Sequence, residues 1–169
     1  FLETTRILSN YNFKKTIKFI GFDLEEAGLI GSTAYVGDNI SAEEQIAGVL
    51  NFEMIGYYTE EPNTQTLPAG FDLLFPDQYA EIENDSSRGN FIGNFGVVNQ
   101  NDWEFAYDNA AATYVPELRV ITFTGPENWE EIAPDLGRSD HGPFWQAGNP
   151  ALMLTGTAEF RNPNYHMPT

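Results

Sequence analysis

Residues 21–32, with the sequence GFDLEEAGLIGS, decide the fold that we expect for this chain. The preceding residues, 16–22, are rich in β-branched and aromatic side chains and predict a buried strand. This strand would lead directly into Glu25 and Glu26 and then into a turn marked by glycines. Open α/β sheets bind ligands at the carboxyl ends of their strands. Because two neighbouring carboxylates point in different directions, one can bind a cation while the other handles a proton.

The adjacent glutamates are weak support alone, because the same pair is common on solvated surfaces. Three later stretches strengthen the interpretation. In residues 50–57, LNFEMIGY, Glu53 interrupts an apolar strand, and a buried carboxylate must be paired, protonated or metal-bound. Residues 138–145, RSDHGPFW, form a predicted loop before the apolar run at 148–155, and the chain ends in residues 164–169, NYHMPT. A histidine lies in each of the last two motifs.

Together and in this order, the four motifs resemble those of the di-zinc aminopeptidase family. This family includes bacterial leucine aminopeptidases, glutamate carboxypeptidase II and, more distantly, glutaminyl cyclases. The resemblance covers nearly the whole chain, and the turn EExGLxGS is its most specific part. It implies an α/β fold of three layers, in which helices cover both faces of a mostly parallel central sheet. The alternation of predicted strands and helices along the chain favours the same architecture.

The resemblance also implies how the chain is organised. We expect residues 1–169 to form a single domain, the C-terminal part of a zinc peptidase catalytic domain. Within it, residues 59–87 contain three prolines and are too long for an ordinary connection, so we expect a long loop or a surface insertion. The apolar run around Phe71 and Phe75 would either line a substrate pocket or pack structurally.

The resemblance assigns roles to individual residues of the four motifs. Glu25 corresponds to the general base that takes a proton from the attacking water. Glu26 and His166 correspond to ligands that share one zinc ion. Glu53 lies where the family places a ligand of the other zinc, usually an Asp and in some members a Glu.

Three further residues are expected beside the metal pocket. Asp140 and His141 belong to a loop that the family places there, and they would either support the metal ligands or contact the substrate. Tyr165 directly precedes His166, and its hydroxyl could donate to the developing oxyanion. The alternative for Tyr165 is an aromatic ring that only packs beside the site.

The expected metal site is incomplete. The family's first two ligands, a His and a metal-bridging Asp, lie upstream of the segment that resembles residues 16–32, and no histidine precedes His141 in this chain. Residues 1–9 resemble the end of the helix that leads into that segment. We therefore expect a fragment that lacks the N-terminal part, supplies three of five usual ligands, and alone holds fewer than two zinc ions or none. Its own activity would be weak or absent.

Composition excludes several classes of protein. The formal net charge of −17 argues against a nucleic-acid partner, because phosphates repel such a surface. A hydrophobic content of 41% with 14% aromatic residues excludes global disorder. No apolar run approaches the length of a membrane span. The absence of Cys excludes disulfides and thiolate metal sites, and the family resemblance suggests a secreted or periplasmic location.

The sequence therefore predicts a zinc-dependent exopeptidase that hydrolyses N-terminal residues of peptide substrates, with a divalent metal as its cofactor. It gives no prediction of the oligomeric state. Two alternatives remain from other classes. The fold could serve as a non-catalytic binding or structural domain, although the retained base and ligands argue against this. A glutaminyl-cyclase-like transferase would use similar residues on one zinc, although the glycine-rich turn favours the peptidase.

Overall fold

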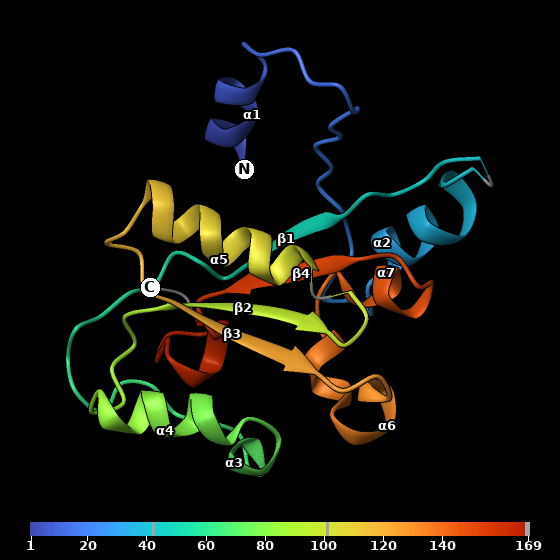
Figure 1. Ribbon diagram of the computed structural model, residues 1–169. Helices are drawn as coiled ribbons and strands as arrows, with labels where there is room; N and C mark the ends of the chain where they lie inside the picture. Colours follow the sequence, from blue (N-terminus) through green and yellow to red (C-terminus); the bar gives the residue numbers. More distant parts are fainter. Residues whose placement is uncertain (42, 101, 168–169) are drawn as a thin grey trace.

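The computed structural model describes residues 1–41, 43–100 and 102–167. Its centre is a four-stranded sheet with the strand order β1–β4–β2–β3 (Figure 1). The strands are β1 (Val49–Glu53), β2 (Ile92–Val97), β3 (Val120–Gly125) and β4 (Ala151–Thr155). β1 pairs with β4 in parallel and β2 pairs with β3 in parallel, whereas β2 and β4 are antiparallel. Two of the three strand pairs are thus parallel, and the expected α/β fold with a mostly parallel sheet is confirmed.

An aromatic cluster fills one face of the sheet. Phe95 of β2 and Phe123 of β3 are register partners, and their rings stack with centroids 4.3 Å apart. Phe71 and Phe75 pack edge-on against Phe123. They come from α3 (Phe71–Leu74) and from the residue that precedes α4 (Pro76–Asn84). Burial of these aromatic rings is what holds the two helices to the sheet.

A second cluster continues the same face toward the other end of the sheet. It centres on Trp129 and Trp145, whose rings lie 5.3 Å apart, with Phe22 packed against it. The two tryptophans come from α6 (Trp129–Ile132) and α7 (Gly142–Gln146). This end of the sheet is also the region of α2 (Ile30–Ala34), which continues into the π-helix η1 (Tyr35–Asn39).

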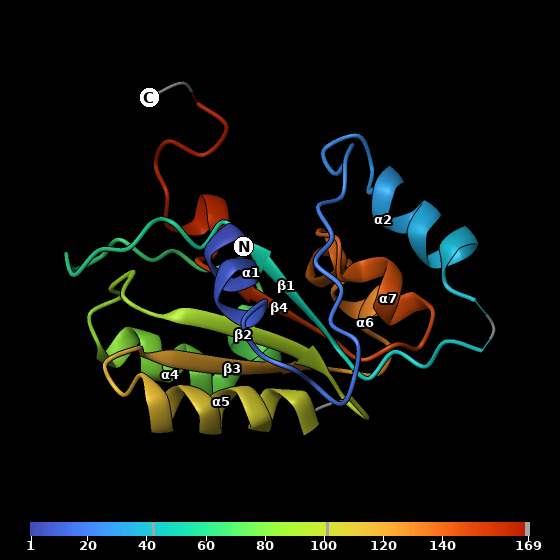
Figure 2. The ribbon, with the colours of Figure 1, turned by 90° about the horizontal axis from the view of Figure 1, so that it is seen from above.

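The opposite face of the sheet carries a single long helix, α5 (Asp102–Tyr114). Figures 1 and 2 show α5 on one side of the sheet and α3 and α4 on the other, so the expected three layers are present. Beneath α5, Leu152 and Leu154 of β4 are fully buried. Leu50 and Phe52 of the edge strand β1 remain 45% and 43% exposed, because α5 does not extend over β1.

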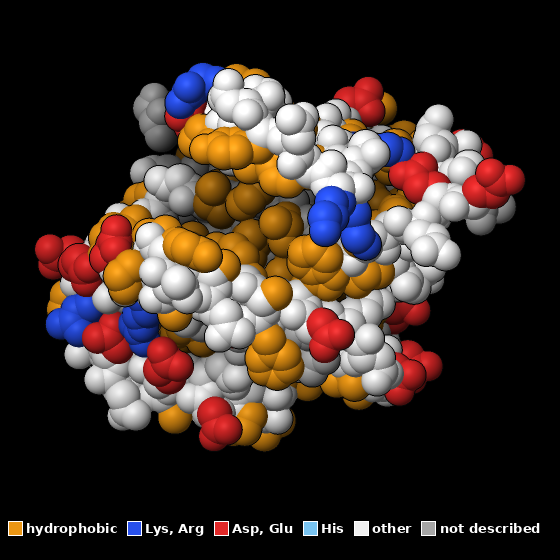
Figure 3. Space-filling model, turned by 45° about the horizontal axis from the view of Figure 1, so that its top comes forward, with side chains coloured by type: hydrophobic (Ala, Val, Ile, Leu, Met, Phe, Trp, Pro, Cys, Tyr) orange, Lys and Arg blue, Asp and Glu red, His pale blue; other side chains and the backbone are white. Residues whose placement is uncertain are grey.

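The N-terminal arm lies outside this body. Helix α1 (Leu2–Leu8) agrees with the helical end expected at residues 1–9, and it stands apart from the sheet (Figure 1). Many large apolar side chains of the arm are exposed, among them Phe1, Leu2 and Phe13. Figure 3 shows hydrophobic side chains gathered around a hollow on this side of the molecule, while most acidic side chains in view stand toward its periphery.

The prediction of a strand at residues 16–22 is wrong. The structure has no strand there, and Glu25 and Glu26 lie in a turn that follows an extended segment. The segment has the composition of a strand, but a strand exists only as part of a hydrogen-bonded ladder. Among the described residues, no other strand pairs with residues 16–22. Phe22 still packs in the core, so that the segment is anchored at its end.

The prediction for residues 59–87 needs a correction in part. The segment is not an irregular loop throughout, because it contains α3 and α4. Phe71, Phe75 and Ile82 from this segment are buried in the aromatic core, so the segment is part of the folded body. The remaining short elements are the 3₁₀ turns η2 (Pro134–Gly137) and η3 (Ala158–Phe160). None of the helices within the described ranges has the length and apolar character to cross a membrane.

Candidate active site

A cavity of about 620 Å³ opens where β1 and β4 end. Its polar end is formed by five of the residues predicted for the site, namely Glu25, Glu26, Glu53, Tyr165 and His166. Its inner wall consists mainly of the apolar core residues Leu67, Phe71, Leu74, Phe75, Phe95, Phe123 and Met153. The structure therefore brings the proposed base and all three proposed metal ligands to the lining of one cavity.

Glu26 and His166 face each other across the mouth of this cavity. The Nε2 atom of His166 lies 2.8 Å from Oε1 of Glu26, and both side chains are more than half exposed. The ring of Tyr165 stacks on the imidazole of His166 with centroids 4.0 Å apart. Burial and the nearby carboxylates of Glu159 and Glu26 raise the pKa of Tyr165, so its hydroxyl keeps its proton and remains a donor.

Glu25 is half-buried beside the other acids of the site. Burial raises its pKa, and the neighbouring carboxylates of Glu53, Glu26 and Asp140 raise it further, while the Arg138 guanidinium opposes them. A carboxylate with a raised pKa holds a proton more strongly and is a better general base near neutral pH. This environment agrees with the role predicted for Glu25.

Glu53 is the last residue of β1, and its carboxylate is held by a neighbour that the sequence did not single out. Ser139 Oγ donates a hydrogen bond of 2.6 Å to Glu53 Oε2. Asn51, two residues before Glu53 and on the same face of β1, donates to Ser139 Oγ over 2.9 Å. Ser139 lay inside the quoted motif, but its separation of 86 positions from Glu53 along the chain hid the contact.

His141 is fully buried and stands behind the cavity wall. Its Nε2 donates to the carbonyl oxygen of Leu136 over 2.7 Å, and its ring packs edge-on against Trp145. Burial lowers the pKa of His141 to about 4, so the imidazole is neutral. Of the two roles predicted for His141, support of the site agrees with this position, whereas direct contact with substrate does not. Asp140 is half-buried, and its Oδ1 atom has no hydrogen-bond partner within the described residues.

Comparisons with known proteins identify the family of this chain. The model of peptidase family M28 matches residues 1–169. The chain belongs to peptidase family M28. It is 30% identical over 173 residues to the uncharacterized protein YfbL of Escherichia coli K12, an alignment that covers 99% of this chain and 48% of YfbL. M28 membership makes this chain a peptidase homologue that spans about half the length of that relative.

The fold of this M28 chain is similar to a solved aminopeptidase structure. The crystal structure of LapA aminopeptidase from Legionella pneumophila superposes with a TM-score of 0.50 and 20% sequence identity. The match covers 98% of this chain and 35% of LapA. At this identity the likeness concerns the fold, and it supports the α/β architecture described above.

Left-handed backbone conformations occur at three positions in and beside the candidate site of this M28 chain. Leu24 precedes the two glutamates and has φ +54°, Met54 follows Glu53 and has φ +48°, and His166 itself has φ +54°. Such conformations are disfavoured for residues with side chains and concentrate at functional sites. The residue before Glu25, the residue after Glu53 and His166 itself therefore carry local strain that the surrounding fold must maintain.

The donor types at this edge suit zinc. Carboxylate oxygens and an imidazole nitrogen are typical zinc ligands, and the clustered carboxylates around Glu25 favour a cation. The number of ligands is smaller than a closed site needs. Within the described ranges, no group of three or more His, Asp or Glu side chains is arranged to hold one metal ion. The M28 chain thus supplies Glu26 and His166 as a pair, with Glu53 separate from it.

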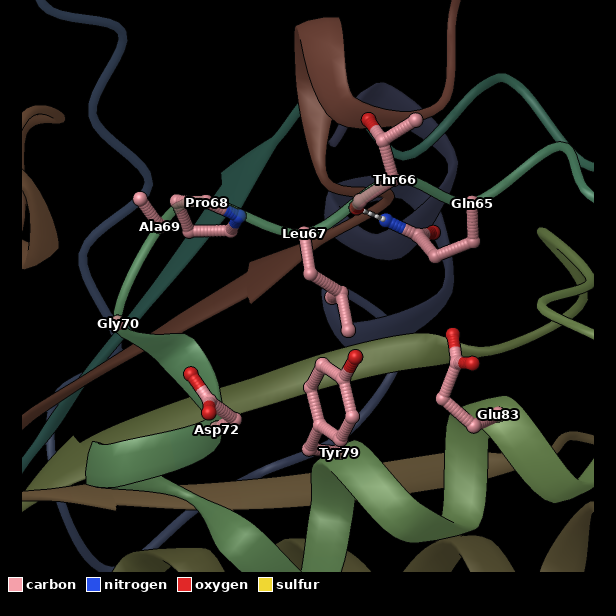
Figure 4. Close-up of a pocket in the computed structure, with 9 residues that line it drawn as sticks. All are labelled: Gln65, Thr66, Leu67, Pro68, Ala69, Gly70, Asp72, Tyr79 and Glu83. Atoms are coloured by element: carbon pink, nitrogen blue, oxygen red, sulfur yellow. Dashed lines mark hydrogen bonds between the residues drawn. The ribbon is translucent and has the colours of Figure 1, made fainter.

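A second hollow of about 340 Å³ lies beside the first. The chain segment 65–69 lines both, so that it forms a wall between them. Figure 4 shows Tyr79, Asp72 and Glu83 on the helix side of this hollow and the segment opposite them, where Gln65 donates to the carbonyl of Thr66. The described lining of this hollow contains no histidine, so we place the candidate site in the first cavity.

Proposed function

We propose that this protein is a zinc-dependent exopeptidase that removes N-terminal residues from peptides. The observation that carries the proposal is the position of Glu25, whose pKa is raised, beside the Glu26–His166 pair at one cavity mouth. A base beside two donors suited to a metal has no purpose in a purely structural domain. Membership of family M28 supports a peptidase activity. The more specific aminopeptidase reaction is our inference.

The roles proposed for the residues follow from their positions. Glu26 and His166 would hold one zinc ion and Glu53 would hold the other. A bound zinc pair would polarise the scissile carbonyl and lower the pKa of the attacking water. Glu25 takes the proton of that water and returns it to the leaving amine. The protonated hydroxyl of Tyr165 stands near Glu26 and can donate to the oxygen on which negative charge develops.

The shape of the cavity suggests which peptides enter. The acids lie at its mouth, where the positive amino group of a peptide would be attracted. The inner wall is apolar and largely aromatic, with Phe71, Phe75 and Met153 among its residues. A large apolar side chain on the first residue of the substrate would bury its surface there. We therefore propose a preference for peptides that begin with such a residue.

We propose this activity for the full-length protein. Because the ligand set within the described residues is incomplete, we expect the 169-residue chain alone to bind zinc weakly and to hydrolyse peptides slowly. A secreted or periplasmic location remains part of the proposal and is tested by fractionation.

The decisive experiment measures hydrolysis of leucine p-nitroanilide by the full-length protein. We expect turnover that a chelator abolishes and added zinc restores. Turnover that is independent of metal, or no turnover with zinc supplied, would contradict the proposal. The same preparation should be offered a peptide with N-terminal glutamine. Formation of pyroglutamate without hydrolysis of the nitroanilide would instead identify a cyclising transferase.

A further inference from the structure

We infer that Asn51 is a positioning residue that acts through Ser139 to fix the carboxylate of Glu53. The inference rests on the proposed role of Glu53 as a metal ligand. Asn51 and Glu53 lie on one face of β1, and Ser139 comes from the loop before α7. Neither Asn51 nor Ser139 takes part in the proposed chemistry.

The contacts form a continuous chain from the cavity into the core. Glu53 Oε2 accepts from Ser139 Oγ at 2.6 Å, and Ser139 Oγ accepts from Asn51 Nδ2 at 2.9 Å. Asn51 Nδ2 also lies 3.5 Å from Nδ1 of His141, and His141 Nε2 lies 2.7 Å from the carbonyl oxygen of Leu136. The bond to Ser139 is the stronger of the two that Asn51 makes, because the contact with His141 is long.

The direction of every bond in this chain follows from the last one. A carbonyl oxygen can only accept, so Nε2 of His141 carries the proton, and the neutral ring leaves Nδ1 as an acceptor. The two atoms that Asn51 Nδ2 contacts, His141 Nδ1 and Ser139 Oγ, therefore both accept a hydrogen bond from the Asn51 amide group. Because Ser139 Oγ already accepts a hydrogen bond from Asn51, its own hydroxyl hydrogen is donated to the carboxylate of Glu53.

This arrangement matters because Glu53 has a flexible side chain. Glu has one more rotatable bond than Asp, which is the more usual residue at this position in the family that the sequence resembles. The carboxylate of Glu53 therefore loses more orientational freedom when it binds a metal. A metal ligand binds best when its orientation is fixed before the metal arrives, and outer partners of ligands commonly supply that orientation. Ser139 is only 3% exposed, so water does not compete effectively for its hydroxyl.

A purely structural tie between β1 and the loop is the alternative. A structural tie would lower the free energy of unfolding when broken but would leave the zinc affinity of the folded protein unchanged. The test therefore measures the dissociation constant for zinc alone by calorimetry, well below the melting temperature of each variant. The variants are Asn51→Ala, Ser139→Ala and the double substitution in the full-length protein, with Ser139→Thr as the variant that retains the hydroxyl.

We expect Asn51→Ala and Ser139→Ala each to weaken zinc binding about 10-fold to 100-fold. The double substitution should bind zinc no more weakly than Ser139→Ala, because both break one chain of bonds. Ser139→Thr should bind as the parent does. Ser87→Ala is the matched control, since Ser87 donates a similar 2.8 Å bond to Glu83, and neither residue lines the first cavity. Additive losses in the double variant, or unchanged affinity in either single variant, would overturn the inference.

A spectroscopic measurement tests the bond directions without any metal. In ¹⁵N spectra of the metal-free protein, His141 should be the neutral Nε2–H tautomer. The substitution Asn51→Ala should shift the Nδ1 resonance of His141. An Nδ1–H tautomer would overturn the positioning chain even if zinc binds normally. Absence of zinc binding by the unsubstituted full-length protein would instead overturn the proposed function, and the positioning role with it. The two failures are therefore distinguishable.

Discussion

The imidazole of His166 and the carboxylate of Glu26 meet at 2.8 Å, although they lie at opposite ends of the chain. Glu26 belongs to the glycine-rich turn that follows the N-terminal arm, and His166 is among the last described residues. Both side chains are well exposed, and an exposed contact of this kind contributes little to stability. His166 also adopts a left-handed backbone conformation to make it. Because a carboxylate and an imidazole are typical zinc ligands, we attribute this strained, exposed contact to the proposed metal site and not to folding.

Glu25→Gln should abolish turnover and leave the metal in place. The substitution keeps the shape of the side chain but removes its capacity to accept a proton. We expect kcat to fall about 100-fold to 10,000-fold, with an unchanged zinc content by atomic absorption. Glu61→Gln, at an exposed position away from the cavity lining, should change neither quantity. Loss of zinc together with activity would show that Glu25 is a ligand and contradict its assignment as the base.

Met153→Trp should narrow the apolar end of the cavity. Met153 lies on β4 between the acids and the aromatic core, so a larger ring there takes space from the substrate side chain. We expect KM for phenylalanine p-nitroanilide to rise about 10-fold, with a much smaller change for alanine p-nitroanilide. Met167→Trp, at a position that is 64% exposed, is the control. An equal rise in KM for both substrates would argue against a side-chain pocket at Met153.

Glu104→Gln should change how stability depends on pH. Glu104 on α5 is 1% exposed and its Oε1 has no partner within the described residues. Burial raises the pKa of Glu104 from 4.5 to about 7, and the one acid that adds to this rise is Asp108 on the same helix. Thr124 and the backbone of Gly96 donate to the carboxylate and partly oppose the rise.

The sign of this effect follows from proton binding. Between pH 4.5 and 7 the folded protein holds the Glu104 proton and the unfolded chain has lost it, so the free energy of unfolding falls as the pH rises. The shift corresponds to a loss of about 3 kcal/mol over this window. Chemical denaturation should show that loss in the parent and in Glu117→Gln, which alters an exposed acid, but not in Glu104→Gln. Parallel curves for parent and Glu104→Gln would contradict the prediction.

Arg161→Met should destabilise the fold without touching the cavity mouth. Arg161 is 4% exposed, and its guanidinium donates to Gln65 and to the carbonyl of Phe91 while covering the Phe91 ring at 4.6 Å. Removing it takes the charged donor from the carbonyl oxygen of Phe91 and leaves Gln65 Oε1 with only its bond from Thr157, and we expect a loss of about 3 kcal/mol in the free energy of unfolding. Arg161→Lys should also be destabilised, because an ammonium group cannot reach both acceptors.

The control for this prediction is an arginine on the surface. Arg6 on α1 pairs with Glu3 in full solvent exposure, so Arg6→Met should change the free energy of unfolding little. If Arg161→Met were as stable as the parent, the buried guanidinium would not hold these segments together. Urea denaturation of the three variants and the parent measures all of these differences.

Local sequence was enough for two strands of the sheet. The apolar runs at 50–57 and 148–155 overlap β1 and β4, because continuous apolar residues must be buried in a sheet. The strand predicted at 16–22 did not form, since a strand also depends on a neighbour that composition does not reveal. Two helices within 59–87 were missed, because prolines and polar residues there outweighed the short apolar stretches in the prediction.

The candidate site divides in the same way. The acids and the histidine near the C-terminus were identified from residue types next to turns, and the structure places them around one cavity. Asn94 in the buried core and Ser139 in the loop before α7 illustrate what could not be predicted, since their partners, Glu104 and Glu53, are defined only by folding. Residues 168–169, which belong to the last motif, lie outside the described residues.

By itself the amino-acid order determined which chemistry this protein can attempt, because carboxylates and imidazoles placed after apolar segments are a property of the chain alone. Only the tertiary structure decided which of them meet, which are buried and which are held by a neighbour. His141 became a neutral core residue and Glu53 acquired Ser139 as a donor. The reason is physical: pKa values and hydrogen-bond directions depend on distances of a few ångströms, and folding alone creates those distances between remote parts of the chain.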